Sequence, residues 1–365
     1  RRVRLKLLNK AKNIKKYKRI LAVLAIVLLT AFIEIIFNFQ SIIGGYDWMD
    51  VTEHMKLEEE GEYEKYVIDF TTDKALYIKQ IRLVGEFASD DAYVMEVQQL
   101  NGFGKSEKVS YWDNVSTWFS ESYTNLNKKV KSIKITLYKP EKTELHSVAF
   151  SNRFEINKYR VLFVVCLLAL LYAMIFEKKF VQKVEWYFLC FSLVFGLLVI
   201  IYAQPTYNAW DEEVHFQNVY SIASGKHVKW SEATQTIIDK KTPSCNTKAE
   251  YAELRAAMNE KGREVLHLET KETGVVSYSF LAYIPTAVMM KIGMLLNLSF
   301  SNMYMLGKIG NLLFYVAIMF LAIRLAKKKK LFLVFIAMMP TSIYLAASYS
   351  YDAVVFACVT LGSVL

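Results

Sequence analysis

Three acids and a histidine follow directly after a long apolar run in this 365-residue chain. Residues 187–203 carry no charge, and the segment WDEEVHF then brings Asp211, Glu212, Glu213 and His215 within five positions. On a helix, Asp211 and His215 would share one face because they are four residues apart. A carboxylate held beside a membrane suits general-base chemistry, in which it takes a proton from a hydroxyl group. The simpler interpretation is a solvated helix start just outside a membrane.

Two further ionisable residues stand out because apolar sequence surrounds them. Asp352 lies between two apolar runs in AASYSYDAVVF, and Lys308 lies in the run that contains LGKIGNLLF. Asp352 is either a second functional acid or only the boundary of a membrane span. Lys308 either faces a phosphate or extends its ammonium group to lipid headgroups. We expect Asp211, Glu212, His215, Lys308 and Asp352 at the same membrane surface, but the sequence does not show that they meet.

Composition and run length place these residues in an α-helical integral membrane protein. Hydrophobic residues make up 54% of the chain, and they come in runs of the length that a membrane span needs. The four cysteines form no CxxC pair, so neither a disulfide framework nor a zinc site is indicated. The last span is cut off by the end of the sequence, so we expect a longer protein. The predicted spans are 20–39, 159–176, 187–203, 303–326, 331–347 and 353–365.

Basic segments predict the orientation of these spans. Residues 1–19 carry ten Lys or Arg and no acid, and two further basic segments contain Lys178, Lys179 and Lys183, and residues 327–330. The positive-inside rule places all three in the cytoplasm. The basic tail then contacts membrane lipids, and we expect no nucleic-acid partner. Localisation is therefore the plasma membrane, with a cytoplasmic N-terminus.

This orientation makes residues 204–302 one external loop that carries the acidic segment. The apolar stretch 275–298 would place residues 327–330 outside if it crossed the membrane, and it contains Pro285 and Lys291. We therefore predict an interfacial helix there, or a helical hairpin that enters and leaves on the same side.

Residues 40–157 are predicted to form an inserted all-β sandwich outside the membrane. In VKSIKITLY, Ile133, Ile135 and Leu137 alternate with polar residues, as expected of a half-buried strand. AYVMEVQQL and LYIKQIRLV behave similarly, and NGFG at 101–104 is a turn signal. The nearby aromatic residues form either a sugar platform or part of the core. They are Tyr111, Trp112, Trp118 and Phe119.

The segments DEEVH, YSFLAYIPTAV, LGKIGNLLF and MPTSIYLAASYSYDAVV resemble a bacterial family of multi-spanning membrane proteins of unknown function that is placed near the GT-C glycosyltransferases. The resemblance covers residues 187–365, and WDEEVHF and AASYSYDA are its most specific parts. The family usually has proline before its two acids, where this chain has Trp210 and Tyr351. It often has arginine at the position of Lys308, and lysine lacks the two-pronged phosphate geometry of arginine.

The resemblance implies a fold and a reaction. The fold is a GT-C-like multi-span region over 158–365 that follows the β unit. The reaction is inverting transfer of a sugar from a lipid-linked polyprenyl-phosphate donor to an envelope glycan acceptor outside the cytoplasm. Asp211 is the expected catalytic base and Glu212 the second choice.

The leaving phosphate needs positive charge in that reaction. His215, Lys308, or a divalent metal (Mg²⁺ or Mn²⁺) held by Asp211 and Asp352 would supply it. No cofactor is certain from the sequence, and two other functions stay open. One is a non-catalytic transporter or flippase of lipid-linked glycans, and the other is a glycan-binding membrane scaffold.

Overall fold

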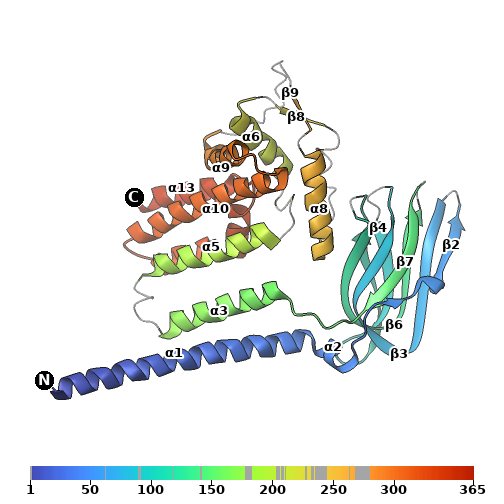
Figure 1. Ribbon diagram of the computed structural model, residues 1–365, viewed down its shortest axis with the longest axis horizontal. Coiled ribbons are helices and arrows are strands. Elements are labelled where there is room, and N and C mark those ends of the chain that lie inside the picture. The colour runs from blue at the N-terminus through green and yellow to red at the C-terminus, as the bar shows by residue number, and fades with distance from the viewer. Residues whose placement is uncertain are drawn as a thin grey trace.

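The computed structural model contains a helical bundle and a β unit that lie at opposite ends of a long molecule (Figure 1). It describes residues 2–61, 63–88, 92–117, 119–139, 142–176, 183–202, 206, 209, 211–226, 228–231, 234, 245–262, 264–267 and 280–365. Within these residues, three helices are long and apolar enough to cross a membrane: Tyr17–Phe37, Val184–Tyr202 and Phe300–Leu325. Apolar helices and a separate antiparallel sheet thus make up a mixed fold that suits a membrane protein.

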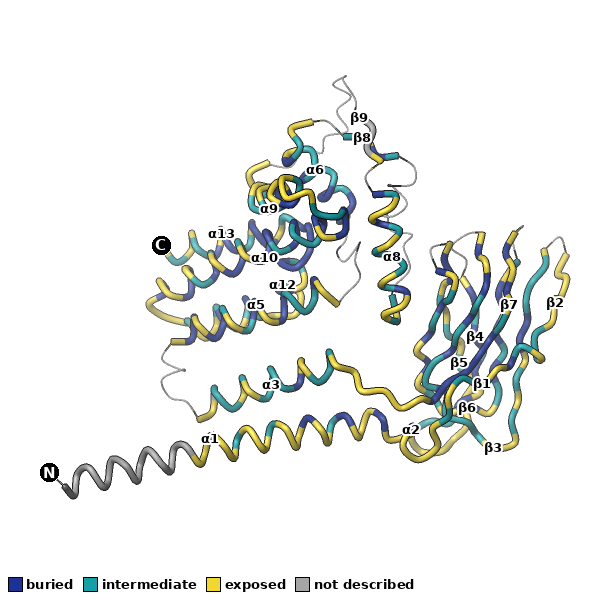
Figure 2. Tube along the Cα trace, viewed as in Figure 1, coloured by how far each residue is buried: buried dark blue, intermediate teal, exposed yellow. Residues whose placement is uncertain are grey.

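Most predicted spans are helices whose bounds shift by a few residues, except that α1 begins at Arg2 and so includes the basic tail. Their bounds are α1 Arg2–Phe37, α3 Lys158–Phe176, α5 Val184–Tyr202, α10 Phe300–Leu325 and α13 Asp352–Val364. Figure 2 shows that α1 is largely exposed over its described side chains, residues 17–37, and the uncovered ones are mostly apolar, among them Leu24, Val27 and Leu28. Such a surface is stable in lipid, where apolar side chains need no cover.

The predicted span 331–347 is not one helix. The chain forms α11 (Lys330–Ala337) and α12 (Pro340–Ala346), with a break at Met338 and Met339. Pro340 is the first residue of α12. It has no N–H to continue the preceding helix, and it disfavours helical geometry at the residue before it. Two short helices therefore make up this apolar run, and its role as a membrane span stays a prediction.

The β unit is one seven-stranded antiparallel sheet rather than the predicted two-sheet sandwich. Its order is β1-β7-β3-β6-β4-β5, and β2 also pairs with β3. The bounds are β1 Met49–Asp50, β2 Met55–Glu60, β3 Tyr63–Glu86, β4 Ala92–Leu100, β5 Ser106–Asn114, β6 Glu121–Lys139 and β7 Glu144–Ser151. Strand β6 buries Ile133, Ile135 and Leu137, as the sequence predicts.

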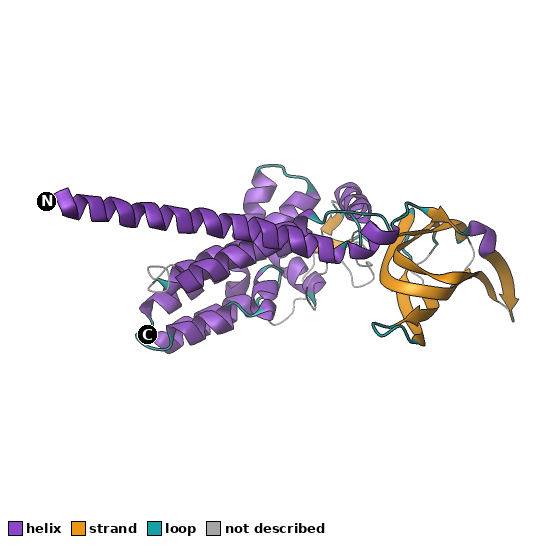
Figure 3. Cartoon of the chain, turned by 90° about the horizontal axis from the view of Figure 1, so that it is seen from below, coloured by secondary structure: helices purple, strands orange, loops and turns teal. Residues whose placement is uncertain are grey.

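Two long strands allow one sheet to enclose a core. The first part of β3 pairs with β2 and the end of β6, whereas its last part pairs with β7 and the start of β6. The register shifts between Thr71 and Leu76, where β-bulges can bend strands. Ile68 from the first part and Leu83 from the last belong to the same buried cluster. The sheet is strongly curved in Figure 3.

The aromatic residues at 111–119, for which a sugar platform and core packing were the alternatives, differ in burial. Phe119 is buried, Tyr111 is half-buried against the core, and Trp112 is 70% exposed. Trp118 lies outside the described residues. Core packing therefore explains part of this aromatic group.

Polar contacts join the β unit to α1 and α3. The short helix α2 (Phe39–Gly44) follows α1, and Asn152 Nδ2 donates to the carbonyls of Gln40 and Gly44. Between the helices, Arg160 Nε and a terminal guanidinium nitrogen donate to the two carboxylate oxygens of Glu34 at 2.5 and 2.8 Å. Such two-pronged pairs are the strong form of ion pair. They fix α1 beside α3 where both meet the β unit.

The remaining elements lie at the end of the bundle that faces the β unit, which we call the β-unit end. They are α6 Glu212–Ser224, β8 Val228–Trp230, α8 Lys248–Lys261, β9 Val265–His267, η2 Phe280–Tyr283 and α9 Ile284–Leu295. Helix α9 packs antiparallel to the start of α10: Gly310 approaches Pro285, and Gly293 approaches Met303. Residues 284–295 are thus a single helix that pairs with α10, and not a hairpin formed within 275–298. An interfacial position for this helix stays a prediction. Residues 275–279 lie outside the described part of the chain.

Candidate functional site

Helix α6 begins inside the predicted acidic segment. Asp211 precedes the helix with φ 58° and ψ 24°, a left-handed conformation that few residues other than glycine adopt. Asp and Asn tolerate it best because their short polar side chains bond locally. Glu212 and Glu213 occupy the first turn and are buried, whereas Asp211 is only half-buried. The helix N-terminus favours negative charge on all three carboxylates.

Glu212 forms a buried ion pair with Lys308 of α10. Glu212 Oε1 lies 3.2 Å from Lys308 Nζ, and the two side chains are 0% and 1% exposed. The backbone N–H groups of Tyr349 and Ala209 also donate to the two Glu212 carboxylate oxygens, at 3.3 Å each. A charge pair this deeply buried needs such extra donors to offset its desolvation. The pair fixes the start of α6 against α10 and the segment before α13.

The segment between α12 and α13 is held by side chains of α10. Asn311 Nδ2 donates to the carbonyls of Ser348 and Ser350, both at 2.9 Å. Tyr349 Oη donates to the carbonyl of Tyr304 at 2.7 Å and packs directly over Gly307. These contacts fix the backbone just before Asp352.

His215 lies one turn along α6 among aromatic side chains. Its Nδ1 is 2.8 Å from Tyr283 Oη, and its ring meets the Tyr351 ring edge-on with centroids 5.2 Å apart. The residue is buried. Residues from α6, η2 and the turn before α13 therefore surround the imidazole.

Burial and three nearby carboxylates shift the pKa of His215 in opposite directions. Burial lowers the pKa of His215 below its usual value of 6.5, while the charges of Asp352, Asp211 and Glu212 raise it. The burial effect is the largest, so the imidazole is neutral at neutral pH. An anion that arrived nearby would add to the effect of the carboxylates and favour the protonated ring.

Asp352 is the most exposed of the predicted site residues. It is the first residue of α13, and its Oδ2 accepts a hydrogen bond from Ser350 Oγ at 3.1 Å. The Asp352 backbone N–H donates to the same Ser350 hydroxyl oxygen at 3.2 Å. The carboxylate is therefore oriented at the surface near His215.

The site lies level with the β-unit end of α5. Helices α5 and α10 touch where Gly196 meets Leu312. Helix α5 continues from Gly196 to Tyr202, a rise of about 9 Å. Along the axis of α10, Lys308 lies about 6 Å from Leu312, toward the same end of the bundle. If α5 crosses a membrane, the site is thus within about one helical turn of that membrane's surface.

The described residues contain no group of three His, Cys, Asp or Glu side chains placed to hold a metal ion. Asp211 and Asp352, the expected ligands of Mg²⁺ or Mn²⁺, therefore have no third protein ligand of these types that would complete a site with them.

The structure brings together all five residues that were singled out in the sequence, but it changes the surroundings of two. Lys308 was expected to face a phosphate at the surface, yet its ammonium is buried against Glu212. Glu212, the second candidate base, is engaged in the same pair. Both therefore position α6 in this structure, while Asp211 and Asp352 reach solvent.

Sequence reasoning missed three polar residues that build the site: Tyr283, Asn311 and Tyr349. All three are uncharged, and they lie in apolar segments where charged residues are the more conspicuous signal. Asn311 follows Lys308 by three residues in an apolar run, and that spacing places both on one helix face. The spacing from Lys308 is therefore a feature of the sequence that points to Asn311.

Comparison with known proteins adds one match. A search of curated proteins and a search of solved structures each found none. Residues 191–365 match the model of a family described as "Predicted membrane protein (DUF2142)". The match includes all five site residues and leaves out α1, the β unit and α3. This half of the chain is thus similar to a family of predicted membrane proteins whose function is unknown.

Proposed function

We propose that this protein is a membrane glycosyltransferase. It moves a sugar from a polyprenyl-phosphate donor to an envelope glycan acceptor, on the extracytoplasmic side of the plasma membrane and with inversion. The observation that carries the proposal is the convergence of Asp211, His215 and Asp352 at the end of apolar helices. A donor with a lipid anchor brings its reactive phosphate to that level, so the catalytic groups are needed there.

In the proposed reaction, an acceptor hydroxyl oxygen attacks the anomeric carbon of the donor sugar. The bond from that carbon to the phosphate oxygen breaks, and polyprenyl phosphate leaves with the electron pair. The Asp211 carboxylate takes the hydroxyl proton as the new glycosidic bond forms, and later releases it to water. A single displacement of this kind inverts the anomeric configuration. Asp352 acts beside Asp211 by orienting the acceptor.

His215 is assigned to the phosphate. Its imidazole is neutral before the donor binds, and a phosphate nearby raises its pKa because an anion favours the charged ring. The ring then donates a hydrogen bond to the leaving oxygen and stabilises its charge. Lys308 supports the same site indirectly, because its pair with Glu212 holds α6 in place.

The decisive experiment measures transfer of radiolabelled sugar from a set of polyprenyl-phosphate donors by the purified protein and its Asp211→Asn variant. Asparagine is the right replacement because it also tolerates the left-handed backbone at this position. Loss of a general base typically reduces the rate by a factor of about 10²–10⁴.

The matched control is Asp73→Asn, which changes an exposed carboxylate in the β unit. It should transfer sugar at the parental rate. Undiminished transfer by a folded Asp211→Asn protein would remove Asp211 as the base. Absence of transfer with every donor would count against an enzyme altogether.

A transporter of lipid-linked glycans is the second candidate, and the buried Glu212–Lys308 pair favours it. Ionisable residues inside membrane helices often mark a transport path. A transporter would move labelled lipid-linked glycan across a vesicle membrane without forming a glycosidic bond. The lipid would then have the same chemical structure after incubation with the parent and with Asp211→Asn. Analysis of the lipid products by mass spectrometry separates the two functions.

A further inference from the structure

A pocket of about 560 Å³ is lined by residues of the β unit and by Gln40 of α2, far along the chain from the proposed catalytic residues. Sites for small ligands commonly fall between about 300 and 1,000 Å³. Gln40, Gln99, Asn101 and Asn127 bring amide groups to this pocket, whereas Leu100 is its one aliphatic side chain. The remaining lining comes from Tyr77, Glu107, Lys128, Lys129, Gly102 and Gly104. A hydroxyl-rich ligand fits this lining better than an apolar one.

Strand β6 is irregular where it crosses the pocket. Its pairing with β3 shifts between Ile78 and Gln80, and its pairing with β4 shifts between Gln98 and Gln99. Asn127, inside the first irregular stretch, has φ 52°. Bulges redirect side chains and are frequent beside functional sites, and strained backbone at a residue other than glycine has the same tendency. The irregularities here bracket Lys128 and Lys129.

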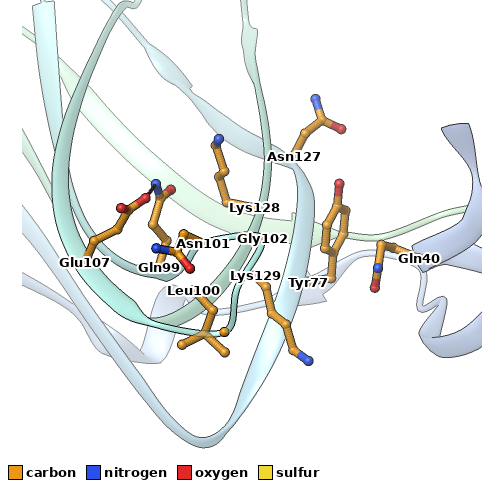
Figure 4. A pocket seen from close by; sticks show the side chains of 11 residues that line it. Gln40, Tyr77, Gln99, Leu100, Asn101, Gly102, Glu107, Asn127, Lys128 and Lys129 are labelled. Atoms are coloured by element: carbon orange, nitrogen blue, oxygen red, sulfur yellow. Dashed lines mark hydrogen bonds between the residues drawn. The ribbon is translucent and has the colours of Figure 1, made fainter.

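One wall of the pocket is pre-organised by hydrogen bonds. Tyr111 Oη donates to Gln99 Oε1 at 2.8 Å, and Gln99 Nε2 donates to Glu107 Oε1 at 2.6 Å. In Figure 4, Gln99 and Glu107 lie at one side of the pocket. Tyr77 and Gln40 lie at the other side, and the two lysines lie between. A fixed polar wall lowers the entropy cost of binding a polar ligand.

The pocket borders the membrane-facing end of the β unit. Gln40 belongs to α2, which begins two residues after the span Tyr17–Phe37 ends. Lys79 Nζ donates to Asn38 Oδ1 at 3.1 Å and to the Arg153 carbonyl at 3.0 Å, which holds β3 to the same junction. A ligand in the pocket would therefore lie close to the lipid headgroups.

We propose that this pocket binds a phosphate-bearing polyol or glycan chain at the membrane surface. The amide groups bond its hydroxyls, and the Tyr77 ring offers an apolar face. Lys128 and Lys129 extend to opposite sides in Figure 4, so they offer positive charge to phosphates on either side of the strand. The site is on a different unit from Asp211, so it does not depend on the proposed catalysis. The phosphate has two possible sources: a free envelope glycan or the headgroup of an anionic lipid.

The test measures binding of a fluorescent glycerol-phosphate oligomer to the full chain in nanodiscs of phosphatidylcholine, by fluorescence anisotropy. The double variant Lys128→Gln/Lys129→Gln should raise the Kd by about tenfold or more, because it removes both ammonium groups. Asn127→Gly should also weaken binding, while glycine accepts the positive φ without strain.

The matched control is Lys131→Gln/Lys134→Gln, which removes the same charge from the same strand outside the pocket. Its Kd should change by less than about twofold if binding is local and not a general charge effect. Equal weakening by both double variants would overturn the proposal, as would no binding by the parent chain. Asp211→Asn should bind the oligomer with the same Kd as the parent. Failure of the pocket proposal is therefore distinguishable from failure of the catalytic proposal.

A second set of nanodiscs separates the two sources of phosphate. If the pocket holds a free glycan, the oligomer should bind equally well to the parent in discs of phosphatidylglycerol. If phosphatidylglycerol abolishes oligomer binding to the parent, the occupant is the lipid headgroup.

Discussion

At the scale of single residues, the buried pair of Glu212 and Lys308 gives the sharpest prediction. Removing one partner leaves the other charge buried and uncompensated, which costs about 3–5 kcal/mol. Glu212→Leu and Lys308→Met should each lower the free energy of unfolding by that amount in detergent. The double variant Glu212→Leu/Lys308→Met should recover much of the loss, because an apolar pair needs no desolvation.

The two single changes and the double change form a thermodynamic cycle. Additive losses in the double variant would mean that the two side chains act independently. That outcome would contradict the pairing in this structure. Lys226→Met on the exposed end of α6 is the control, since it removes a solvated charge and should change stability by less than about 0.5 kcal/mol.

His215 predicts a pH dependence of stability. Its pKa is lowered in the folded protein, so the unfolded chain binds the proton more readily. Stability should therefore fall as pH drops below about 6.5. His215→Gln should abolish this part of the dependence. Asp352→Asn should extend it to lower pH, because loss of that carboxylate lowers the imidazole pKa further.

The measurement is denaturant unfolding of the parent and both variants between pH 5 and pH 8, the range in which histidine titrates. The informative quantity is the difference between each variant and the parent. A difference for His215→Gln that is constant over this range would show that the His215 pKa is not shifted by folding.

The residue types of the site were readable from the sequence, but their pairing was not. Acids and a lysine inside apolar runs are costly, so they stand out in any membrane chain. Which acid neutralises Lys308 depends on how α6 packs on α10, and nothing local fixes that. The ionisable residues were therefore visible in the sequence, whereas their ion pair and the surrounding Tyr283, Asn311 and Tyr349 were not.

At the scale of elements, Gly307 controls the contact between α10 and the segment before α13. A Cβ at this position would lie near the Tyr349 hydroxyl, and its closest approach would be only 2.3 Å. Gly307→Ala should displace Tyr349 and lower stability by about 1–3 kcal/mol, as overpacking does. Thermal unfolding in detergent checks this prediction.

Gly362 in α13 is a matched helical control, because a Cβ there meets nothing within 4 Å. Gly362→Ala should be neutral or stabilise the helix by up to about 1 kcal/mol. Equal effects of the two substitutions would show that helix propensity, rather than contact with Tyr349, explains the role of Gly307.

Helix α8 docks on the β unit through one buried carboxylate. Glu250 completes the capping box of α8 with Thr247, and it also accepts the Tyr123 backbone N–H from β6 at 2.9 Å. Burial raises the pKa of Glu250 to about 6, above its usual 4.5. The folded state therefore binds the proton more readily. Stability from this group should fall as pH rises from about 4.5 to about 6.

Glu250→Gln should remove this dependence. It should also weaken docking, because Glu250 accepts the Tyr123 N–H on one oxygen and the Thr247 N–H on the other, whereas an amide has only one acceptor oxygen. The expected loss is about 1–3 kcal/mol at neutral pH. Hydrogen exchange at the Tyr123 amide reports docking directly. Unchanged protection of that amide in Glu250→Gln would show that α8 and β6 are held together by other contacts.

The elements themselves were largely predictable because long apolar runs and strand alternation are local signals. The exceptions depend on chain geometry over longer distances. Pro340 divides one apolar run into two helices, and β3 and β6 are long enough to serve both halves of one sheet. Alternation predicts which face of a strand is buried, but not whether the strand continues around a bend.

At the scale of the whole molecule, the basic segments gather at one end of the helical bundle. In Figure 1, the N-terminus, the start of α5 and the end of α10 lie at the end away from the β unit. Lys183 and residues 327–330 belong to this basic end, as does the basic tail. The site, α8 and the α9–α10 hairpin lie at the β-unit end. This separation is the arrangement that the positive-inside rule favours, with the basic end in the cytoplasm.

That orientation predicts which positions an impermeant reagent reaches. In a chain whose four cysteines are replaced by alanine, single cysteines at Ser106, Lys226 and Asn297 should react with a membrane-impermeant maleimide on intact cells. Lys328→Cys should react only after the cells are permeabilised. Asn297 tests whether the stretch 275–298 crosses the membrane, because it lies in the turn between α9 and α10. A crossing would place Asn297 in the cytoplasm, where the reagent does not reach it. Labelling of Lys328→Cys on intact cells would place the basic end outside, and a polyprenyl-phosphate donor on the extracytoplasmic face could then no longer reach Asp211.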